Sequence, residues 1–240
     1  MRRSKALAKI RAGEAVRICS LGHDIPAYIR HAADKDFDCL WLDLEHRHIP
    51  HRTVQALIAE CHRADIDCMV RAPTLEKAKL YRYLEDGAAG VMIPHVATVE
   101  QAQLLVEALK FPPIGNRGLD GAGFDGDHWV DGGADYPEKA NQETFLVVQI
   151  ESPQAIENVS DIASVEGVDG LFIGPGDLGL RLKLTQDLTM EQCIEKVSKA
   201  AKDHGKAWGM PVGSVELLKA IHEQGAQLLA YGGEFQALVR

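Results

Sequence analysis

The chain has 240 residues, a length that suits one α/β barrel domain of about 250 residues. Its 26 Lys and Arg stand against 35 Asp and Glu, so the formal net charge is −9, which argues against nucleic acid or an anionic membrane as a partner. No run reaches the roughly 18 apolar residues of a membrane span, and the basic N-terminus lacks the apolar core of a signal peptide, so we expect a cytoplasmic protein.

Short apolar runs alternate with longer amphipathic stretches along the whole chain. Eight runs are predicted strands: Val16–Ser20, Cys39–Asp43, Cys68–Arg71, Gly90–Pro94, Leu146–Glu151, Gly170–Gly174, Ala207–Met210 and Gln227–Tyr231. Helical patterns between them include Thr53–Arg63, Leu75–Glu85, Val99–Lys110, Pro153–Ala163, Met190–His204 and Val215–Gln224. Near-continuously apolar strands separated by helices are typical of a parallel sheet buried on both faces. Eight such repeats predict an α/β protein with a single (β/α)₈ TIM barrel over residues 1–240.

One segment, residues 112–141, breaks this rhythm. It is rich in Gly, Pro, Asp and Asn and shows little apolar periodicity. A loop of this length in a compact domain is usually functional or disordered. Because it comes after the fourth strand, we expect it to lie over the carboxyl-terminal face of the barrel, where barrel active sites are built.

Polar and charged side chains follow five of the predicted strands at the point where each strand ends. They are Asp43, Glu45 and His46 after the second strand, Arg71 at the third, His95 at the fourth, Gln149 and Glu151 at the fifth, and Asp177 after the sixth. The carboxyl ends of barrel strands share one rim, so these side chains should converge there. An apolar core would not select such residues for these positions.

Two of these residues are candidate metal ligands. Glu151 and Asp177 are 177 − 151 = 26 residues apart, about one strand–helix–strand step. Paired carboxylates without a neighbouring thiolate or a tight histidine cluster favour a hard cation such as Mg²⁺ or Mn²⁺. Each residue could instead cap the helix that follows it, and the proline in Ser152-Pro153 suits a first helical turn. The spacing does not decide between these readings.

Other rim residues also have two readings. Gly174-Pro175-Gly176 could expose backbone N–H groups that hold a carboxylate, or could be a structural turn. Arg71 could pair with a barrel carboxylate or neutralise charge on a substrate oxygen. His46 lies three residues after Asp43, which could orient its ring for proton transfer, or it could be a surface histidine.

Two motif matches and the cysteines carry no chemistry in this interpretation. The G-x-G-x-x-G match at residues 121–126 has no strand before it, so no nucleotide cofactor is expected. His46-Arg-His48 resembles a zinc pair of hydrolase barrels, but that pair belongs on the first strand. The five cysteines form no C-x-x-C pair and are expected to be free thiols in a reducing compartment.

Several motifs together resemble one family. They are residues 37–46 (FDCLWLDLEH), 70–73 (VRAP), 87–94 (GAAGVMIP), 115–118 (GNRG), 148–151 (VQIE) and 171–178 (LFIGPGDL). In this order they are similar to the HpcH/HpaI aldolases, class II pyruvate aldolases that include 4-hydroxy-2-oxoheptanedioate and 2-keto-3-deoxy-sugar-acid aldolases. The resemblance implies a barrel of the phosphoenolpyruvate/pyruvate-domain type that reversibly cleaves a 4-hydroxy-2-oxo acid to pyruvate, or a close 2-oxo acid, and an aldehyde.

The resemblance also implies a metal centre. Carried over by position, Glu151 and Asp177 would bind a divalent cation, Mg²⁺ or Mn²⁺, with Co²⁺ as a further candidate. Arg71 would hold the keto oxygen and stabilise the enolate together with the metal. Chelation of pyruvate by the metal lowers the cost of removing a methyl proton.

The remaining site residues are implied in the same way. His46, supported by Asp43, would move protons at the acceptor hydroxyl. Gln149 would orient pyruvate, and the loop containing Gly174 and Gly176 would receive its carboxylate. The partners would be a small 2-oxo acid and an aldehyde.

Three segments differ from the family pattern: Cys19–His23, Gly118–Gly126 and Tyr231–Arg240. They concern the acceptor pocket and the subunit contacts, so the aldehyde stays open. The resemblance implies a homo-oligomer, a hexamer or a trimer. Two alternatives are kept: an acyl-CoA or citryl-type lyase of the same barrel superfamily, and a non-catalytic barrel that binds an oxo acid.

Overall fold

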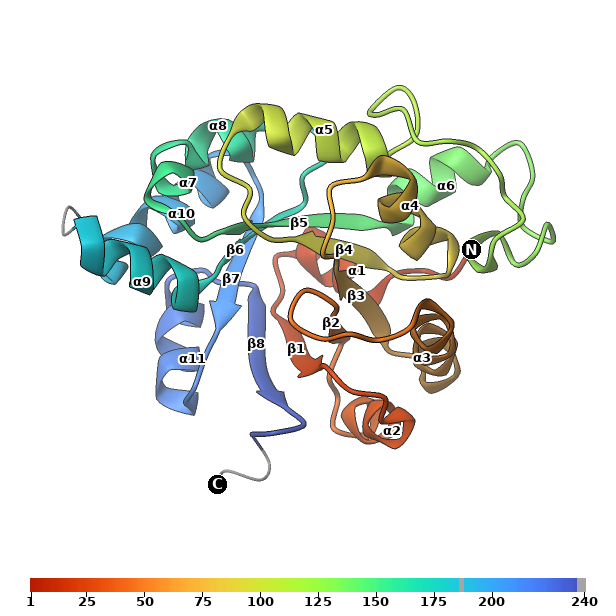
Figure 1. Ribbon diagram of the computed structural model, residues 1–240, viewed down its shortest axis with the longest axis horizontal. Coiled ribbons are helices and arrows are strands. Elements are labelled where there is room, and N and C mark those ends of the chain that lie inside the picture. The colour runs from red at the N-terminus through yellow and green to blue at the C-terminus, as the bar shows by residue number, and fades with distance from the viewer. Residues whose placement is uncertain (186–187, 237–240) are drawn as a thin grey trace.

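The strands form one closed barrel. The computed structural model, drawn in Figure 1, describes residues 1–185 and 188–236. Each strand pairs in parallel with the next strand along the chain, and β8 closes the barrel by pairing with β1. The predicted (β/α)₈ architecture is therefore confirmed. In the described part of the chain no helix has the length and apolar character needed to cross a membrane.

All eight predicted strands are present, and their bounds differ from the predicted ones by at most two residues. They are β1 Val16–Leu21, β2 Cys39–Asp43, β3 Asp67–Arg71, β4 Gly90–Ile93, β5 Phe145–Ile150, β6 Gly170–Ile173, β7 Ala207–Pro211 and β8 Leu228–Gly233. They are almost entirely buried because one face lines the barrel interior and the other lies under helices.

The helices surround the barrel (Figure 1). They are α1 Lys5–Ala12, α2 Pro26–Asp34, α3 His51–Ala64, α4 Lys77–Glu85, α5 Val99–Leu109, α6 Tyr136–Glu143, α7 Pro153–Glu157, α8 Val159–Ser164, α9 Pro175–Thr185, α10 Met190–Asp203 and α11 Val215–Glu223. Several begin at a side chain that accepts a backbone N–H of the first turn. These N-cap residues are Ser4, Thr98, Ser152, Thr189 and Ser214.

Apolar side chains pack in an inner and an outer layer. Inside the barrel, alternate residues of the strands meet one another, among them Ile18, Trp41, Met92 and Phe172. The opposite faces of the strands pack against the helices and form the larger part of the core. The five cysteines are free thiols within these layers.

The segment 112–141 lies elsewhere than predicted. It connects α5 to β5, and a helix-to-strand connection leads to the amino-terminal ends of the strands. Its residues Tyr136 and Ala140 form a small cluster with Phe111 against Met1, and the terminal amine of Met1 pairs with Asp131. Figure 1 shows the segment beside the N-terminus. The expected place over the carboxyl-terminal face is therefore wrong, because the predicted helix before the segment had already returned the chain to the other end. Part of the segment is also helical, as α6.

The amino-terminal end of the barrel is closed by α1. Its Ala6 and Leu7 pack with the inner layer. The side chain of Asp67, which is 0% exposed, holds this helix in place by accepting from the Ser4 hydroxyl at 2.7 Å, the Ala6 N–H at 2.8 Å and Arg2 Nη1 at 2.5 Å. A buried carboxylate that lacked these donors would be costly, so strand β3 and the N-terminal helix depend on each other.

Asp67→Asn should therefore lower the free energy of unfolding by about 3 kcal/mol. The amide NH₂ group cannot accept a hydrogen bond, and the amide carries no charge to balance that of Arg2. Asp65→Asn is the matched control, because Asp65 also pairs with Arg2 but is 68% exposed. We expect it to cost at most about 1 kcal/mol. Urea unfolding of both variants measures the difference, and equal effects would contradict the role of Asp67.

Candidate active site

Charged side chains converge at the carboxyl ends of β2 to β5. Arg71 ends β3 and lies beside Asp43, the last residue of β2: Nε is 3.0 Å from Asp43 Oδ1 and Nη2 is 2.7 Å from Oδ2. Its Nη1 lies 3.0 Å from Glu45 Oε2. The guanidinium also lies over the ring of Trp41, 4.7 Å from the centroid. Of the two readings of Arg71, pairing with a barrel carboxylate is thus observed, and it fixes the plane of the guanidinium.

The two carboxylates do not use all the hydrogen-bond donors of Arg71. A guanidinium carries five N–H groups, and the contacts with Asp43 and Glu45 use one on each nitrogen. Both terminal nitrogens retain a second N–H. Arg71 can therefore still donate to a substrate oxygen while its charge is balanced by the two carboxylates.

Asp43 is held in its ionised form. Burial raises its pKa, but the hydrogen bonds and the charge of Arg71, together with the backbone N–H groups of His46 and Glu45, outweigh burial, so its pKa is lowered. The two backbone bonds are 3.0 Å from Glu45 and 3.3 Å from His46. Asp43 thus anchors both Arg71 and the turn that follows β2.

His46 is at the rim and 55% exposed. Its ring nitrogen Nε2 lies 3.6 Å from Glu45 Oε2, while its contact with Asp43 is made through its backbone N–H. The expected orientation of the imidazole by Asp43 is therefore not what the geometry shows. Asp43 positions the backbone of His46, and Glu45 is the carboxylate that faces the ring.

Glu151 follows β5 and its side chain is only 4% exposed. Its Oε1 accepts from the backbone N–H of His95 at 2.7 Å and lies 2.9 Å from His95 Nδ1. Burial raises the pKa of Glu151; His95 lowers it, and the charges of Glu45 and Asp177 raise it, so the net shift is upward. The helix-cap alternative fails for Glu151, because α7 is capped by Ser152 instead.

The Gly174-Pro175-Gly176 segment is the start of a helix and not a separate turn. Pro175 is the first residue of α9, and Asp177 lies in its first turn, where a carboxylate suits the helix dipole. The first N–H groups of a helix have no partner within it, and nothing lies within 4 Å of the Cβ that a side chain would add at Gly176. A substrate carboxylate could approach this helix start.

The residues at this place fit a hard cation. Burial raises the pKa of Glu151, and the negative charges of Glu45 and Asp177 raise it further, so a nearby cation would stabilise its ionised form. Gln149 Oε1 is buried and has no hydrogen-bond partner among the described residues, which suits a site that supplies one. Within the described ranges no group of three or more His, Cys, Asp and Glu side chains is arranged around a point. The protein would therefore offer two carboxylates, leaving other coordination positions to substrate and water.

No role is predicted from the sequence for three residues that the structure brings into this site: Glu45, His95 and Arg181. Glu45 and His95 follow strand ends, but their partners come from other strands. Arg181 lies one turn after Asp177 on α9, and its Nη1 is 2.6 Å from the backbone oxygen of Glu151 and 3.5 Å from Asp177 Oδ1. Only this last pair carries a signal in the sequence, the i,i+4 spacing of opposite charges.

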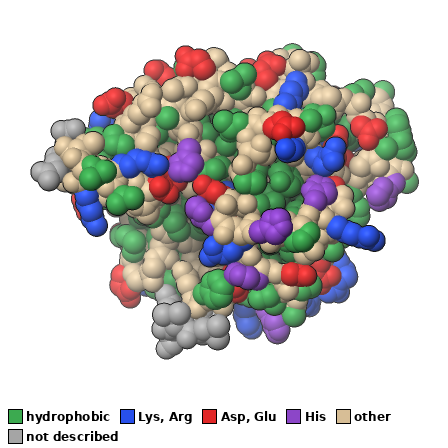
Figure 2. All heavy atoms as spheres, in the orientation of Figure 1, with side chains coloured by type: hydrophobic (Ala, Val, Ile, Leu, Met, Phe, Trp, Pro, Cys, Tyr) green, Lys and Arg blue, Asp and Glu red, His purple; other side chains and the backbone are tan. Residues whose placement is uncertain are grey.

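Histidine, acidic and basic side chains lie close together near the middle of the face shown in Figure 2.

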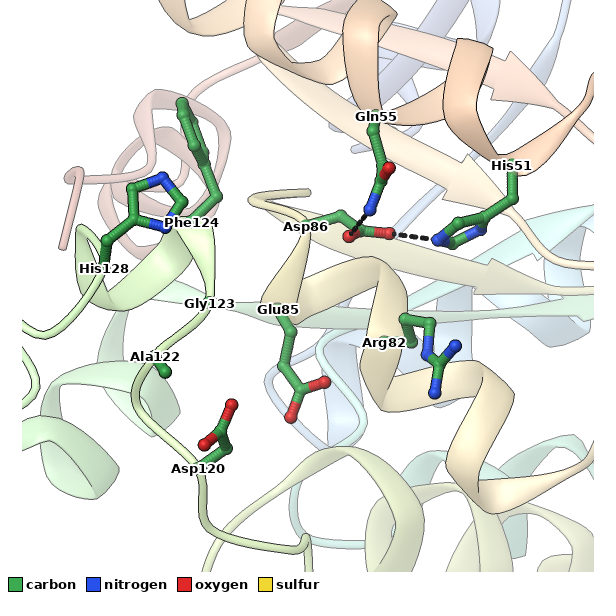
Figure 3. Close-up of a pocket in the computed structure, with 10 residues that line it drawn as sticks. All are labelled: His51, Gln55, Arg82, Glu85, Asp86, Asp120, Ala122, Gly123, Phe124 and His128. Carbon is green, nitrogen blue, oxygen red and sulfur yellow. Dashed lines mark hydrogen bonds and ion pairs between the residues drawn. The ribbon is translucent and has the colours of Figure 1, made fainter.

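A separate hollow of about 550 Å³ lies between α3, the end of α4 and the segment 112–141 (Figure 3). Within it Asp86 accepts from Gln55 at 2.7 Å and lies 3.0 Å from His51. None of the residues that line this hollow belongs to the rim site, so the two are distinct.

A closed (β/α)₈ barrel with a paired arginine and buried carboxylates at the strand ends is the architecture of a barrel enzyme. The family described as HpcH/HpaI aldolase/citrate lyase matches residues 19–240. A hydroxypyruvate/pyruvate aldolase of Deinococcus radiodurans is 34% identical over 87% of this chain and 76% of its own. A 4-hydroxy-2-oxo-heptane-1,7-dioate aldolase of Escherichia coli is 31% identical over 87% and 80%. The crystal structure of an HpcH/HpaI aldolase from Desulfitobacterium hafniense superposes with a TM-score of 0.89 at 31% identity, over 97% of this chain and 91% of that one. The chain belongs to the HpcH/HpaI aldolase/citrate lyase family.

The lowered pKa of Asp43 makes a prediction about pH. A carboxylate with a lowered pKa adds stability above its unfolded value, here 3.8, and loses it as the pH falls through the folded value. Asp43→Asn should therefore cost about 2 kcal/mol of unfolding free energy at pH 7. The difference from wild type should shrink below pH 3.8.

Urea unfolding between pH 7 and pH 3 measures this difference. Asp34→Asn, an exposed carboxylate beside Lys35, is the control and should show little change at any pH. A constant difference across the whole range would contradict an ionised Asp43 in the folded state.

Proposed function

We propose that this chain is a divalent-metal-dependent aldolase, a carbon–carbon lyase that cleaves a 4-hydroxy-2-oxo acid to pyruvate, or a close 2-oxo acid, and an aldehyde. The single observation that carries the proposal is the meeting of a fixed Arg71, with N–H groups to spare, and a buried Glu151 at one rim. An aldolase needs both, because charge develops on the keto oxygen while the donor is held by its carboxylate and keto group. The names of the relatives agree with this reaction.

Glu151 and Asp177 would hold the cation, for which we propose Mg²⁺ or Mn²⁺, with Co²⁺ as a further candidate. Bound there, the cation would act as a Lewis acid toward the keto oxygen. The oxygen donors favour hard cations. The buried Gln149 lies beside Glu151, with its Nε2 3.4 Å from Glu151 Oε2, and would orient the oxo acid. The helix start at Gly174 and Gly176 would receive the carboxylate of pyruvate.

Cleavage breaks the C3–C4 bond of the oxo acid. The C4 hydroxyl loses its proton, the aldehyde leaves, and the electron pair moves toward the keto oxygen. Arg71 stabilises the negative charge there with its remaining N–H groups. His46, exposed at the rim beside Glu45, takes the hydroxyl proton directly or through water. A proton that C3 takes from water completes the methyl group of pyruvate, and release of the hydroxyl proton from His46 to water keeps the overall reaction proton-neutral.

We further propose a cytoplasmic homo-oligomer, a hexamer or a trimer, on the resemblance to the family. The segments that concern the acceptor pocket differ from the family pattern, so the proposal names no particular aldehyde. Neither nucleic acid nor a nucleotide cofactor has a place in the proposed reaction.

Exchange of pyruvate methyl protons in D₂O, followed by NMR, tests the donor half of the reaction without any aldehyde. We expect exchange with Mg²⁺ or Mn²⁺ and none with EDTA. Arg71→Ala should slow exchange by about 10²- to 10³-fold, because it removes the donor to the developing charge. Glu151→Gln should abolish exchange at metal concentrations that saturate the wild type.

Matched controls separate this outcome from general damage. Arg52→Ala and Glu223→Gln change exposed residues of the same types and should leave exchange unchanged. Exchange that survives EDTA, or that Arg71→Ala leaves intact, would overturn the proposed chemistry. No exchange from folded, metal-loaded protein would exclude pyruvate as the donor and favour the lyase or binding alternatives.

A further inference from the structure

His95 adopts an unusual backbone conformation. It follows β4 after Pro94 and has φ of +58°, a left-handed value that side-chain-bearing residues rarely adopt. Its side chain is 50% exposed, so burial of the ring does not explain the conformation. Strained residues of this kind persist where the surrounding contacts hold them, and they cluster at functional sites.

Two contacts of His95 converge on one atom of Glu151. The left-handed turn brings the backbone N–H of His95 to 2.7 Å from Glu151 Oε1 and its Nδ1 to 2.9 Å from the same oxygen. Two groups of one residue therefore occupy a single carboxylate oxygen.

The other oxygen of Glu151 faces a different direction. An ideal Cβ at Gly174 would lie 2.1 Å from Glu151 Oε2, so this oxygen lies against the segment that leads into α9 and Asp177. Gln149 Nε2 is 3.4 Å away, a weak contact. The two oxygens therefore differ in their contacts: Oε1 is occupied by His95, and Oε2 lies against Gly174.

The second nitrogen of the ring connects to the arginine. His95 Nε2 lies 3.3 Å from Glu45 Oε1, and Glu45 Oε2 lies 3.0 Å from Arg71 Nη1. One imidazole therefore contacts a carboxylate at each of its nitrogens. It links Glu151, which follows β5, to Glu45, one of the two carboxylates that pair with Arg71.

We propose that His95 is a positioning residue that holds Oε1 of Glu151 so that Oε2 is presented to a divalent cation, and that it couples this carboxylate to Arg71 through Glu45. The inference rests on the proposed metal-dependent function. It resembles the general pattern in which a second side chain fixes a metal ligand and sets its affinity for the ion.

Two substitutions separate the ring contacts while keeping the backbone. Asn and Gly both tolerate the left-handed conformation. His95→Asn places an amide N–H near the position of Nδ1 and so keeps the contact with Glu151, but it cannot reach Glu45. His95→Gly removes both ring contacts. His48→Asn, an exposed histidine, is the matched control.

The measurement is Mn²⁺ affinity of the full-length protein without substrate, from the EPR signal of free Mn²⁺. We expect His95→Gly to bind Mn²⁺ about 10- to 100-fold more weakly than wild type. His95→Asn should recover most of that affinity, and His48→Asn should equal wild type. Thermal unfolding without metal checks that each variant is folded.

The outcomes distinguish this inference from the proposed function. Wild-type binding with equal affinity in His95→Gly would overturn the role of His95 and leave the metal site standing. Nitrogen hyperfine coupling to Mn²⁺ that disappears in His95→Gly would also overturn it, because His95 would then be a ligand itself. Failure of the folded wild type to bind Mn²⁺ would overturn both proposals.

Discussion

A guanidinium enclosed at the mouth of a barrel has to be neutralised, and the pairing of Arg71 with Asp43 and Glu45 is the interaction on which the rest of the site depends. Both carboxylates come from β2 and the turn after it, while the arginine ends the neighbouring strand. The fork of contacts fixes the plane of the guanidinium over Trp41. A fixed plane also fixes the positions of the remaining N–H groups on Nη1 and Nη2, and donors held in advance are what stabilisation of a developing negative charge requires.

The carboxylates of the rim lie in opposite electrostatic environments. Asp43 is partly buried, but Arg71 and two backbone N–H groups lower its pKa, so it stays charged as an anchor. Burial raises the pKa of Glu151, and the charges of Glu45 and Asp177 raise it further. Environments that separate the pKa values of neighbouring carboxylates are typical of groups with different tasks. A divalent cation bound at Glu151 would stabilise the ionised carboxylate and so offset the effect of burial and of the neighbouring negative charges.

The sequence predicted the barrel and the residue types of the rim because both depend on local patterns. Apolar runs mark strands, and a charged residue such as Arg71 or Glu151 at the end of such a run is conspicuous. Contacts across strands have no local signal: that His95 lies between Glu45 and Glu151 depends on closure of the barrel and on one left-handed residue. The segment 112–141 follows the helix α5, which returns the chain to the amino-terminal ends of the strands, so the strand order alone predicts the wrong end of the barrel for it.

A crystal structure with Mn²⁺ and pyruvate tests the central claim most directly, since the anomalous signal of manganese locates the ion independently of the protein atoms. The ion should lie between Glu151 and Asp177, with the keto oxygen of pyruvate within hydrogen-bond distance of Arg71 and its carboxylate at the start of α9. Manganese at another place, for example at His46 and His48, or pyruvate bound away from Arg71, would contradict an aldolase site at this rim.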